Sequence, residues 1–388
     1  SIVRLQVIPK DAGIDGAIKE ITIVRNKVKL EEQQAKKSII EIPNGMSKAK
    51  IGVITIPMFY MDFAAYAAGD KDFRSTTRDT QKLIDELVAE KVEGILIDLR
   101  NNGGGSLVEA VSLTGLFIKS GPVVQVRNKS GKIDLNEDED PSIAYTGPLS
   151  VLVNRYSASA SEIFAGAMQD YGRATIIGEP TYGKGTVQSI VDLNRYVDEG
   201  VTLGKLKLTM AQFFRVNGDS TQHRGVVPDI VFPTANQGKN QGESSLENAL
   251  PWANIKSAKF SPYAINDINL DDIKTNHKNR IAKDDGFKFL LAELEERSKI
   301  MDKKELTLQK AKRKAERESM EKIQKNRLNQ FRVSRGMKPV EKAASNDDDE
   351  PVDEKLKDEL DGIEVREAAA IMIDVISSSQ NKLAQHTK

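Results

Sequence analysis

Three short clusters of small and polar residues contain the side chains of this sequence that are best suited to catalysis. The clusters are RNNGGG (100–105), SASASE (157–162) and EPTYGKG (179–185). The second offers three serine hydroxyls, and the third offers an amine, Lys184, between two glycines. A hydroxyl, a base that can accept its proton and backbone donors for an oxyanion are the parts of an acyl-transfer site. The residue types therefore indicate acyl transfer.

The positions within these clusters suggest a role for each group. Ser159 stands where a helix should begin, so free N–H groups and the helix dipole favour developing negative charge there. Lys184 can act as the base if burial lowers its pKa enough to leave the amine neutral. Gln188 could then fix the direction of that amine, and the N–H groups of Ala160 and Gly105 are the expected oxyanion donors.

Other interpretations of the same residues remain open at this level. A serine at a helix start is most often only an N-cap, and Ser157 and Ser161 lie within two residues of Ser159. A lysine between glycines is commonly a solvated turn residue, and His223, in the loop before GVVPDI, is an alternative base. Chemistry is favoured because all three clusters follow strand patterns.

The segment GEPTYGKG (178–185) also comes close to the phosphate-binding motif G-x-x-x-x-G-K-[ST]. Gly185 stands where that motif needs a hydroxyl for Mg²⁺. The following VDLNR indicates a strand and a loop, not the helix that binds phosphate. The sequence therefore argues against nucleotide hydrolysis.

Apolar runs place each cluster directly after a strand. GILIDL (94–99), LSVLV (149–153) and ATIIG (174–178) have the pattern of short buried strands. The carboxyl ends of parallel strands form one edge, where ligands bind. The helix after Ser159 should carry the chain about 18 Å away, and the next strand should return it by about 16 Å. Ser159 and Lys184 should therefore lie at the same edge.

The remaining pattern of residues 51–235 is that of an α/β domain with a mostly parallel, covered sheet. A helix over 74–91 should turn Leu83, Leu87 and Val88 to one face. The other expected elements are strands at 50–56, 186–191, 205–216 and 226–233 and helices at 107–119 and 160–171.

The composition of the 388 residues excludes several classes of site. There are no cysteines, which removes thiol nucleophiles, disulfides and thiolate metal sites. The three histidines are too scattered to form a metal cluster. Lys plus Arg and Asp plus Glu number 57 each, so no net charge directs the molecule to nucleic acid. No apolar run reaches the roughly 20 residues of a membrane-spanning helix.

After about residue 256 the sequence becomes charged and helical. A helical pattern runs over 271–335, with a basic excess over 299–338. We interpret that excess as a solvated helix face in preference to a nucleic-acid surface, because aromatic residues are not interleaved with it. The segment SNDDDEPVDE (345–354) indicates an exposed acidic linker before one last helix at 355–383.

Long stretches of the chain resemble the carboxyl-terminal processing peptidases, and in particular the tail-specific protease subgroup of Gram-negative bacteria. The resemblance is carried by IDLRNNGGGSLVEAVSLTGLFI, GPLSVLVNRYSASASEIFAGAMQDYGRATIIGEPTYGKGTVQ and RVNGDSTQHRGVVPDIVFPT. These stretches fall within residues 50–235. The similarity continues through NALPW (248–252) and NHKNRIAKD (276–284) into the helical tail.

The resemblance implies an assignment for each residue of the predicted site. The nucleophile, the lysine base, its orienting glutamine and the two oxyanion amides fall on Ser159, Lys184, Gln188, Gly105 and Ala160. An acidic residue of the family matches Asp170, where we expect a supporting role. Gly103 stands where most of the wider family has proline, but the tail-specific subgroup shows glycine there too.

The resemblance also implies the fold class and the order of the domains. We expect the last strands of a PDZ domain at 1–31, a crotonase-like or ClpP-like α/β Ser–Lys peptidase core at 32–255, and an all-helical C-terminal domain at 256–388. A PDZ domain captures a C-terminal tail by strand addition, but its carboxylate-binding loop is missing here. The chain opens inside the strand IVRLQVI, so we interpret it as part of a longer protein.

The function that the resemblance implies is that of a periplasmic serine endopeptidase acting on proteins with apolar, accessible C-termini. The implied partners are such substrates and a lipoprotein adaptor, with no nucleic acid, at most peripheral membrane association, and no metal or organic cofactor. Two alternatives belong to other classes, an inactive peptide-binding scaffold and a crotonase-type acyl-CoA enzyme. The intact set of Ser159, Lys184 and Gln188 argues against the first, and the Ser–Lys spacing argues against the second.

Overall fold

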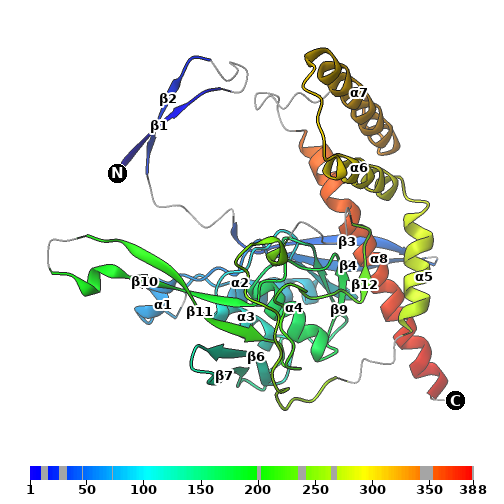
Figure 1. Cartoon of the computed structure of the whole chain (residues 1–388). Helices are drawn as coiled ribbons and strands as arrows, with labels where there is room; N and C mark the ends of the chain where they lie inside the picture. Colours follow the sequence, from blue (N-terminus) through cyan, green and yellow to red (C-terminus); the bar gives the residue numbers. More distant parts are fainter. Residues whose placement is uncertain are drawn as a thin grey trace. The chain divides into compact units, whose positions relative to one another are not determined.

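A computed structural model gives the fold of the chain (Figure 1). The chain divides into two compact units, one formed by residues 1–32 and 304–360 and the other by residues 33–303 and 361–388. Residues 345–352 of the expected acidic linker lie outside the described residues. The structure describes residues 1–9, 16–25, 33–45, 47–71, 73–198, 202–234, 242–263, 269–340 and 353–386.

The second unit is built on a six-stranded sheet. Its strands are β3 Lys36–Asn44, β4 Ser47–Thr55, β5 Gly94–Asp98, β8 Leu149–Val153, β9 Thr175–Gly178 and β12 Ile230–Val231. They lie in the order β12, β9, β8, β5, β4, β3, and every neighbouring pair is parallel except β3 with β4. The prediction of a mostly parallel sheet is confirmed for these strands, although the strand expected at 226–233 is only two residues long.

Helices cover both faces of this sheet. The helices of the described residues are α1 Phe63–Ala67, α2 Thr76–Ala89, α3 Leu107–Gly115, α4 Ala160–Asp170, α5 Leu270–Ile281, α6 Asp285–Asp302, α7 Lys310–Ser334 and α8 Glu354–His386. Ile95 and Ile97 of β5 belong to a buried cluster with residues of α2, α3 and α4. Because side chains alternate between the faces of a strand, Gly94 and Asp98 face the other side. There Met372 of α8 packs directly against Gly94.

One predicted core position of helix α2 is wrong. Its buried face contains Thr80, Ile84 and Leu87, and Leu83 is partly buried against the same core. Val88, which we expected beside Leu87, is 50% exposed. The reason is geometric, because consecutive residues of a helix point about 100° apart. The face toward the sheet is therefore set by residues three and four apart.

A second sheet is antiparallel and has the strand order β10, β11, β6, β7. The bounds are β6 Gly121–Asn128, β7 Ile133–Asp138, β10 Thr186–Asp192 and β11 Lys205–Phe214. The sequence patterns indicate β10 and β11 but neither β6 nor β7, and they do not separate the two sheets. Figure 1 shows β10 and β11 as a long ribbon that extends beyond the core. The exposed apolar side chains of these two strands include Ile190, Leu208 and Met210. Since β10 follows Gly185 at once, no phosphate-binding helix forms there.

The C-terminal region is helical, as predicted. The pattern at 271–335 corresponds to α5, α6 and α7, and the last helix is α8. His277 and Arg280 join α5 to α8: Nδ1 of His277 lies 2.9 Å from Glu367, and Arg280 pairs with Glu367 and Asp374. Helices α5 and α6 and residues 361–388 belong to the same compact unit as the sheets. Over the described ranges, no helix is long and apolar enough to cross a membrane.

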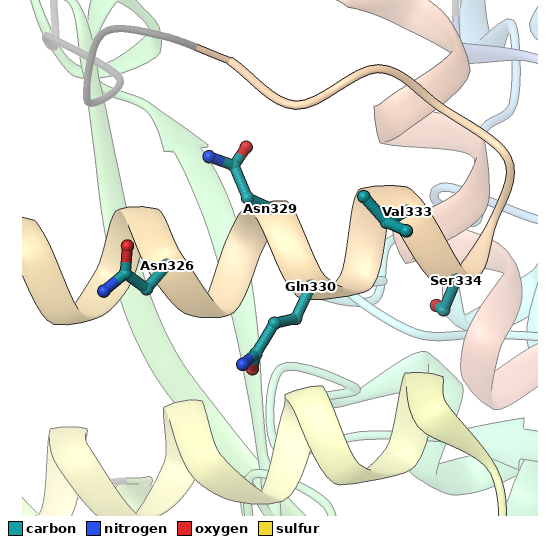
Figure 2. Close-up of a pocket in the computed structure, with 5 residues that line it drawn as sticks. All are labelled: Asn326, Asn329, Gln330, Val333 and Ser334. Carbon is teal, nitrogen blue, oxygen red and sulfur yellow. The ribbon is translucent and has the colours of Figure 1, made fainter.

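The first unit contains the N-terminal hairpin and α7. Strands β1 (Ile2–Val7) and β2 (Lys19–Val24) pair antiparallel along their whole length. Asn329 of α7 exchanges two hydrogen bonds of 2.7 and 3.0 Å with the backbone of Val340. Figure 2 shows a surface pocket whose labelled residues all come from α7, namely Asn326, Asn329, Gln330, Val333 and Ser334. None of these side chains is charged, so this pocket lacks the groups of an acid–base site.

Candidate active site

Ser159 lies at the junction between strand β8 and helix α4. It is the N-cap of α4, with φ of +58° and ψ of −111°, a conformation that residues other than glycine rarely adopt. An ordinary N-cap residue is extended. Such strain persists only where the surrounding structure imposes it, and it gathers at functional sites. The backbone thus singles out Ser159 among the residues of this turn.

The three serines of the SASAS segment differ in their surroundings. Ser157 Oγ donates to the carbonyl of Leu99 at 2.8 Å, and Ser161 Oγ donates to the carbonyl of Asn102 at 2.9 Å. Both side chains are completely buried, whereas Ser159 is half-buried. Ser157 and Ser161 therefore have structural roles in holding the turn against strand β5 and the loop that follows it.

The buried carboxylate of Glu162 connects the serine turn to the lysine loop. Its Oε2 accepts the N–H of Ser159 at 2.8 Å and the N–H of Lys184 at 3.0 Å. Its Oε1 accepts the N–H of Gly183 at 2.7 Å and the hydroxyl of Thr181 at 2.6 Å. Burial raises the pKa of Glu162 to about 7, although these hydrogen bonds act in the opposite direction. The backbone N–H groups of Ser159 and Lys184 thus both donate to the same carboxylate oxygen.

A second polar group holds the lysine loop from its other side. The N–H of Gly185 donates to Oε1 of Gln222 at 2.8 Å, and the hydroxyl of Thr221 donates to the carbonyl of Lys184 at 3.2 Å. Gln222 is completely buried and also donates to the carbonyl of Leu250 at 2.8 Å. The loop that carries Lys184 is therefore fixed and not an ordinary solvated turn.

The environment of Lys184 favours its neutral form. Burial, and next the positive charge of Lys207, lower the pKa of the Lys184 amine below its ordinary value. The carboxylates of Glu243 and Glu162 act in the opposite direction but do not reverse the shift. A lowered pKa is what a lysine needs in order to act as a base near neutral pH.

The glycine loop after β5 approaches the start of α4. A Cβ atom added to Gly104, which has φ of +102°, would lie 2.8 Å from Cβ of Ser159 and 3.0 Å from the nitrogen of Ala160. Only glycine can occupy that position. Ala160 is the first residue of α4, so its N–H has no acceptor within the helix, and Gly105 follows directly in the loop. The two predicted oxyanion amides thus lie on adjoining segments.

Asn102 fastens the glycine loop to the serine turn. Its carbonyl accepts the N–H of Ala158 at 3.0 Å and the hydroxyl of Ser161. Its side chain donates to the carbonyl of Ile56 at 2.8 Å and accepts the N–H of Gly104 at 2.9 Å. The residue is completely buried, so the positions of the two loops depend on each other.

Among the described residues, no hydrogen bond joins Gln188 to Lys184. Its amide donates to the hydroxyls of Thr186 at 3.1 Å and Thr209 at 3.4 Å. A bulge between Val187 and Gln188 shifts the pairing of β10 with β11, and such bulges re-aim side chains. The orienting role of Gln188 stays a prediction.

Asp170 ends helix α4, and at 1.5 Å per residue it lies about 16 Å from Ser159. It pairs with Arg215, whose Nε donates to Oδ2 at 3.1 Å, and it accepts a hydrogen bond from Asn217 at 2.9 Å. Asp170 therefore fixes the far end of α4 and does not touch the predicted reacting groups. Any support that it gives reaches Ser159 through the helix.

His223, the alternative base, meets the site through its backbone. It has φ of +66°, and its N–H donates to the carbonyl of Gly183 at 2.8 Å. Its Nε2 is buried and has no hydrogen-bond partner among the described residues. These contacts make His223 part of the support of the lysine loop.

Sequence reasoning missed three residues of this site, namely Asn102, Glu162 and Gln222. A signal exists for Glu162, which follows Ser159 by three residues in the pattern of a capping box. We find no comparable signal for the other two. Asn102 has an identical neighbour, Asn101, and Gln222 lies 38 positions after Lys184.

Two models of known protein families match most of this chain. Residues 50–232 match the model described as Peptidase family S41, and residues 237–377 match the C-terminal domain of tail specific protease. The two matched stretches are those of a peptidase domain followed by a C-terminal domain, which is helical in this structure. The chain belongs to peptidase family S41, in its tail-specific protease group.

The chain is similar to several named relatives. It is 41% identical over 390 residues to the Tail-specific protease of Haemophilus influenzae, covering 99% of this chain and 52% of that protein. It is 39% identical over 161 residues to the Carboxy-terminal-processing protease of Bartonella bacilliformis, covering 41% of this chain and 35% of that protein. The solved photosystem II D1 C-terminal processing protease is 28% identical with a TM-score of 0.43, covering 60% of this chain and 55% of that one. The chain spans about half the length, or less, of these relatives.

Proposed function

We propose that this chain carries the catalytic and C-terminal parts of a serine endopeptidase with Ser159 as nucleophile and Lys184 as base. The observation that carries the proposal is the Glu162 carboxylate, which accepts the N–H groups of both residues on the same oxygen. The lowered pKa of Lys184 supports its role as a neutral base. Membership of peptidase family S41 supports the reaction type.

In the proposed reaction, the neutral Lys184 amine takes the hydroxyl proton of Ser159 while Oγ attacks the peptide carbonyl. The N–H groups of Ala160 and Gly105 stabilise the oxyanion. The protonated lysine then gives its proton to the leaving amine, and the acyl-enzyme forms. Water, deprotonated by the same lysine, attacks the ester, and the lysine returns that proton to Oγ of Ser159 as the second product leaves, so that both groups end in their starting forms.

The test is a serine-to-alanine series measured on an unfolded protein substrate. Ser159→Ala should abolish cleavage without loss of folding. Ser157→Ala and Ser161→Ala are matched controls that should retain cleavage but lower the free energy of unfolding by about 0.5–1.5 kcal/mol each, because each removes one buried hydrogen bond to a carbonyl that keeps its backbone donor. Cleavage by folded Ser159→Ala protein at the wild-type rate would refute the assignment of Ser159 as the nucleophile.

We also propose that the substrates are proteins with apolar, accessible C-terminal tails, that the protein works in the periplasm, and that a lipoprotein adaptor assists it. The support is the similarity to a protein named tail-specific protease in Haemophilus influenzae, together with the resemblance described above. The test uses one substrate with an apolar tail and the same substrate with a charged tail. Equal cleavage of both by a longer chain with a complete PDZ domain would contradict the tail preference.

For the N-terminal hairpin, we propose that β1 and β2 are the last strands of that PDZ domain. The hairpin supports this by exposing apolar side chains on its own surface, among them Ile2, Leu5, Ile23 and Val24. Two strands are marginally stable alone, so this surface is suited to packing against further strands. Circular dichroism of the longer chain should show added strand content, and hydrogen exchange should show protection of the backbone amides of these residues.

A further inference from the structure

Helix α8 follows the whole length of the central strand β5. Met372 packs against Gly94, the first residue of β5, while Glu364 binds Arg100, just beyond Asp98 at the end of the strand. The helical rise from Glu364 to Met372 is about 12 Å, close to the length of the strand. Helix α8 therefore runs antiparallel to β5 and reaches the edge of the sheet at which the predicted site lies.

Arg100 joins Glu364 to the glycine loop. Its Nη1 donates to Oε2 of Glu364 at 2.8 Å, and its Nε and Nη2 donate to the carboxylate of Asp98 at 2.8 to 3.2 Å. The side chains are 14% exposed for Arg100 and 6% for Asp98. Arg100 is also the first residue of the loop that carries Gly104 and Gly105 to the start of α4.

The same side chain of α8 lies beside the beginning of the lysine loop. Glu364 and Glu179 line one small cavity of about 60 Å³, together with apolar side chains of α6. Glu179 is the first residue of the loop that carries Lys184, and its Oε2 accepts the N–H of Arg155 at 3.3 Å. One residue of the C-terminal helix thus lies at the first residues of both loops.

We propose that Glu364 is a positioning residue for the peptidase reaction and that it holds the glycine loop in its productive place through Arg100. The proposal rests on the Ser159–Lys184 function proposed above. Glu364 does not need to touch the substrate, because it acts on the direction of the Arg100 guanidinium. Gly104 leaves no room for a methyl group against Ser159, so a small movement of this loop changes where the amide of Gly105 lies relative to the serine.

A second ion pair of the same helix offers a matched control. Asp374 of α8 pairs with Arg280 of α5 at 2.7 Å, compared with 2.8 Å for Glu364 with Arg100. The acidic side chains are similarly exposed, at 20% for Asp374 and 27% for Glu364. Arg280 lies on a helix and not on a loop of the site. Replacement of Glu364 or of Asp374 should therefore lower the free energy of unfolding by similar amounts, but only replacement of Glu364 should lower kcat.

The experiment compares Glu364→Ala, Glu364→Gln and Asp374→Ala at a temperature well below all three melting temperatures. We expect Glu364→Ala to lower kcat at least roughly tenfold with unchanged KM, since small misplacements of catalytic groups cost about that much or more. A fluorophosphonate probe should label Ser159 more slowly by the same factor. Glu364→Gln, which keeps an acceptor for Arg100, should restore most of both rates, and Asp374→Ala should leave them unchanged.

The proposal is overturned if Glu364→Ala retains wild-type kcat, or if it and Asp374→Ala change kcat and melting temperature alike. If Glu364→Ala does not fold, Glu364→Asp takes its place, because the shorter side chain breaks the contact with Arg100 but keeps the charge. Ser159→Ala, measured beside these variants, distinguishes a failure of this inference from a failure of the proposed function. An active Ser159→Ala protein would refute the proposed function, whereas an inactive one with normal Glu364 variants would refute only this inference.

Discussion

At the scale of single residues, the candidate site keeps two carboxylates close to a lysine that must be neutral to act. An opposite charge ordinarily stabilises an ammonium group. Here Glu162 is buried and accepts three backbone N–H groups and one hydroxyl, so part of its charge is balanced by those dipoles. Burial of Lys184 and the nearby Lys207 then outweigh Glu162 and Glu243.

The first residue-scale prediction concerns Lys207. Lys184 must lose its proton to act, so activity should rise with pH through the pKa of Lys184. Lys207 lowers that pKa, and its removal should therefore raise it. We expect Lys207→Gln to move the rising limb of the pH–kcat/KM profile to higher pH, and Lys207→Glu to move it further.

A neighbouring lysine provides the control for this experiment. Lys205 lies two residues before Lys207 on β11. It pairs in register with Asp192, whereas Lys207 pairs with Ile190, so Lys205 lies farther along the β10–β11 hairpin from Lys184. Lys205→Gln should leave the pH profile unchanged. Equal shifts for the Lys205 and Lys207 variants would mean that net surface charge, and not the position of Lys207, sets the profile.

At the scale of elements, three loops form the site, and buried polar side chains hold each of them. Asn102 fastens the glycine loop, Glu162 fastens the serine turn to the lysine loop, and Gln222 holds the lysine loop from its other side. Because these residues are completely buried, removing one of them leaves unpaired backbone groups away from water. The loops should therefore behave as one rigid unit.

The element-scale prediction concerns the fit of the glycine loop against α4. In Gly104→Ala, the added methyl would meet Ser159 and the nitrogen of Ala160, at a φ of +102° that alanine rarely adopts. We expect kcat to fall by about a hundredfold or more. The conformational cost alone should be roughly 1–2 kcal/mol of folding free energy. Kinetic assays and thermal unfolding measure the two effects separately.

Gly103→Ala is the matched control for that variant. A Cβ on Gly103 meets no atom within 4 Å, and its φ is not positive. The substitution should leave both kcat and stability nearly unchanged. If the two variants were equally active, the glycine loop would not need to lie close to Ser159, and the oxyanion assignment of Gly105 would lose its support.

At the scale of the whole molecule, the C-terminal helix completes the compact unit that contains the site. Residues 361–388 belong to that unit although they follow the sheet by more than a hundred residues. The buried side chains of α8 include Ile363, Val365, Ile371, Met372, Ile373 and Val375. Each such side chain contributes about 1.5–3 kcal/mol by its burial, and domains are stable by only about 5–15 kcal/mol in total.

The whole-molecule prediction follows from that comparison. A chain that ends at Leu360 should lose the cooperative thermal unfolding of the peptidase unit and should aggregate, because one face of its sheet is uncovered. A chain that ends at Ser379 keeps the buried residues of α8 and should unfold like the full chain. Circular dichroism and size-exclusion chromatography distinguish these outcomes, and a soluble, active chain ending at Leu360 would contradict the covering role of α8.

The sequence alone was enough to predict several individual strands and helices of this protein. The strands at 94–99 and 149–153 and the helix after Ser159 could be predicted because apolar runs and small-residue turns act over a few neighbouring residues. The lengths of a helix and a strand then place Ser159 and Lys184 at the same edge, which agrees with their shared contact with Glu162. The choice of Ser159 among three serines came from the resemblance to a known family.

The side chains that hold these parts together could be identified only in the folded protein. The exposure of Val88, the separate antiparallel sheet, the hydrogen bonds of Asn102 and the contact of Glu364 with Arg100 all depend on partners distant in sequence. The physical reason is that the burial and the hydrogen bonds of a side chain depend on the groups that surround it in the folded protein. Residue type and periodicity describe only its neighbours along the chain, so the shared sheet edge of Ser159 and Lys184 was predictable, but Asn102 and Gln222 as their supports were not.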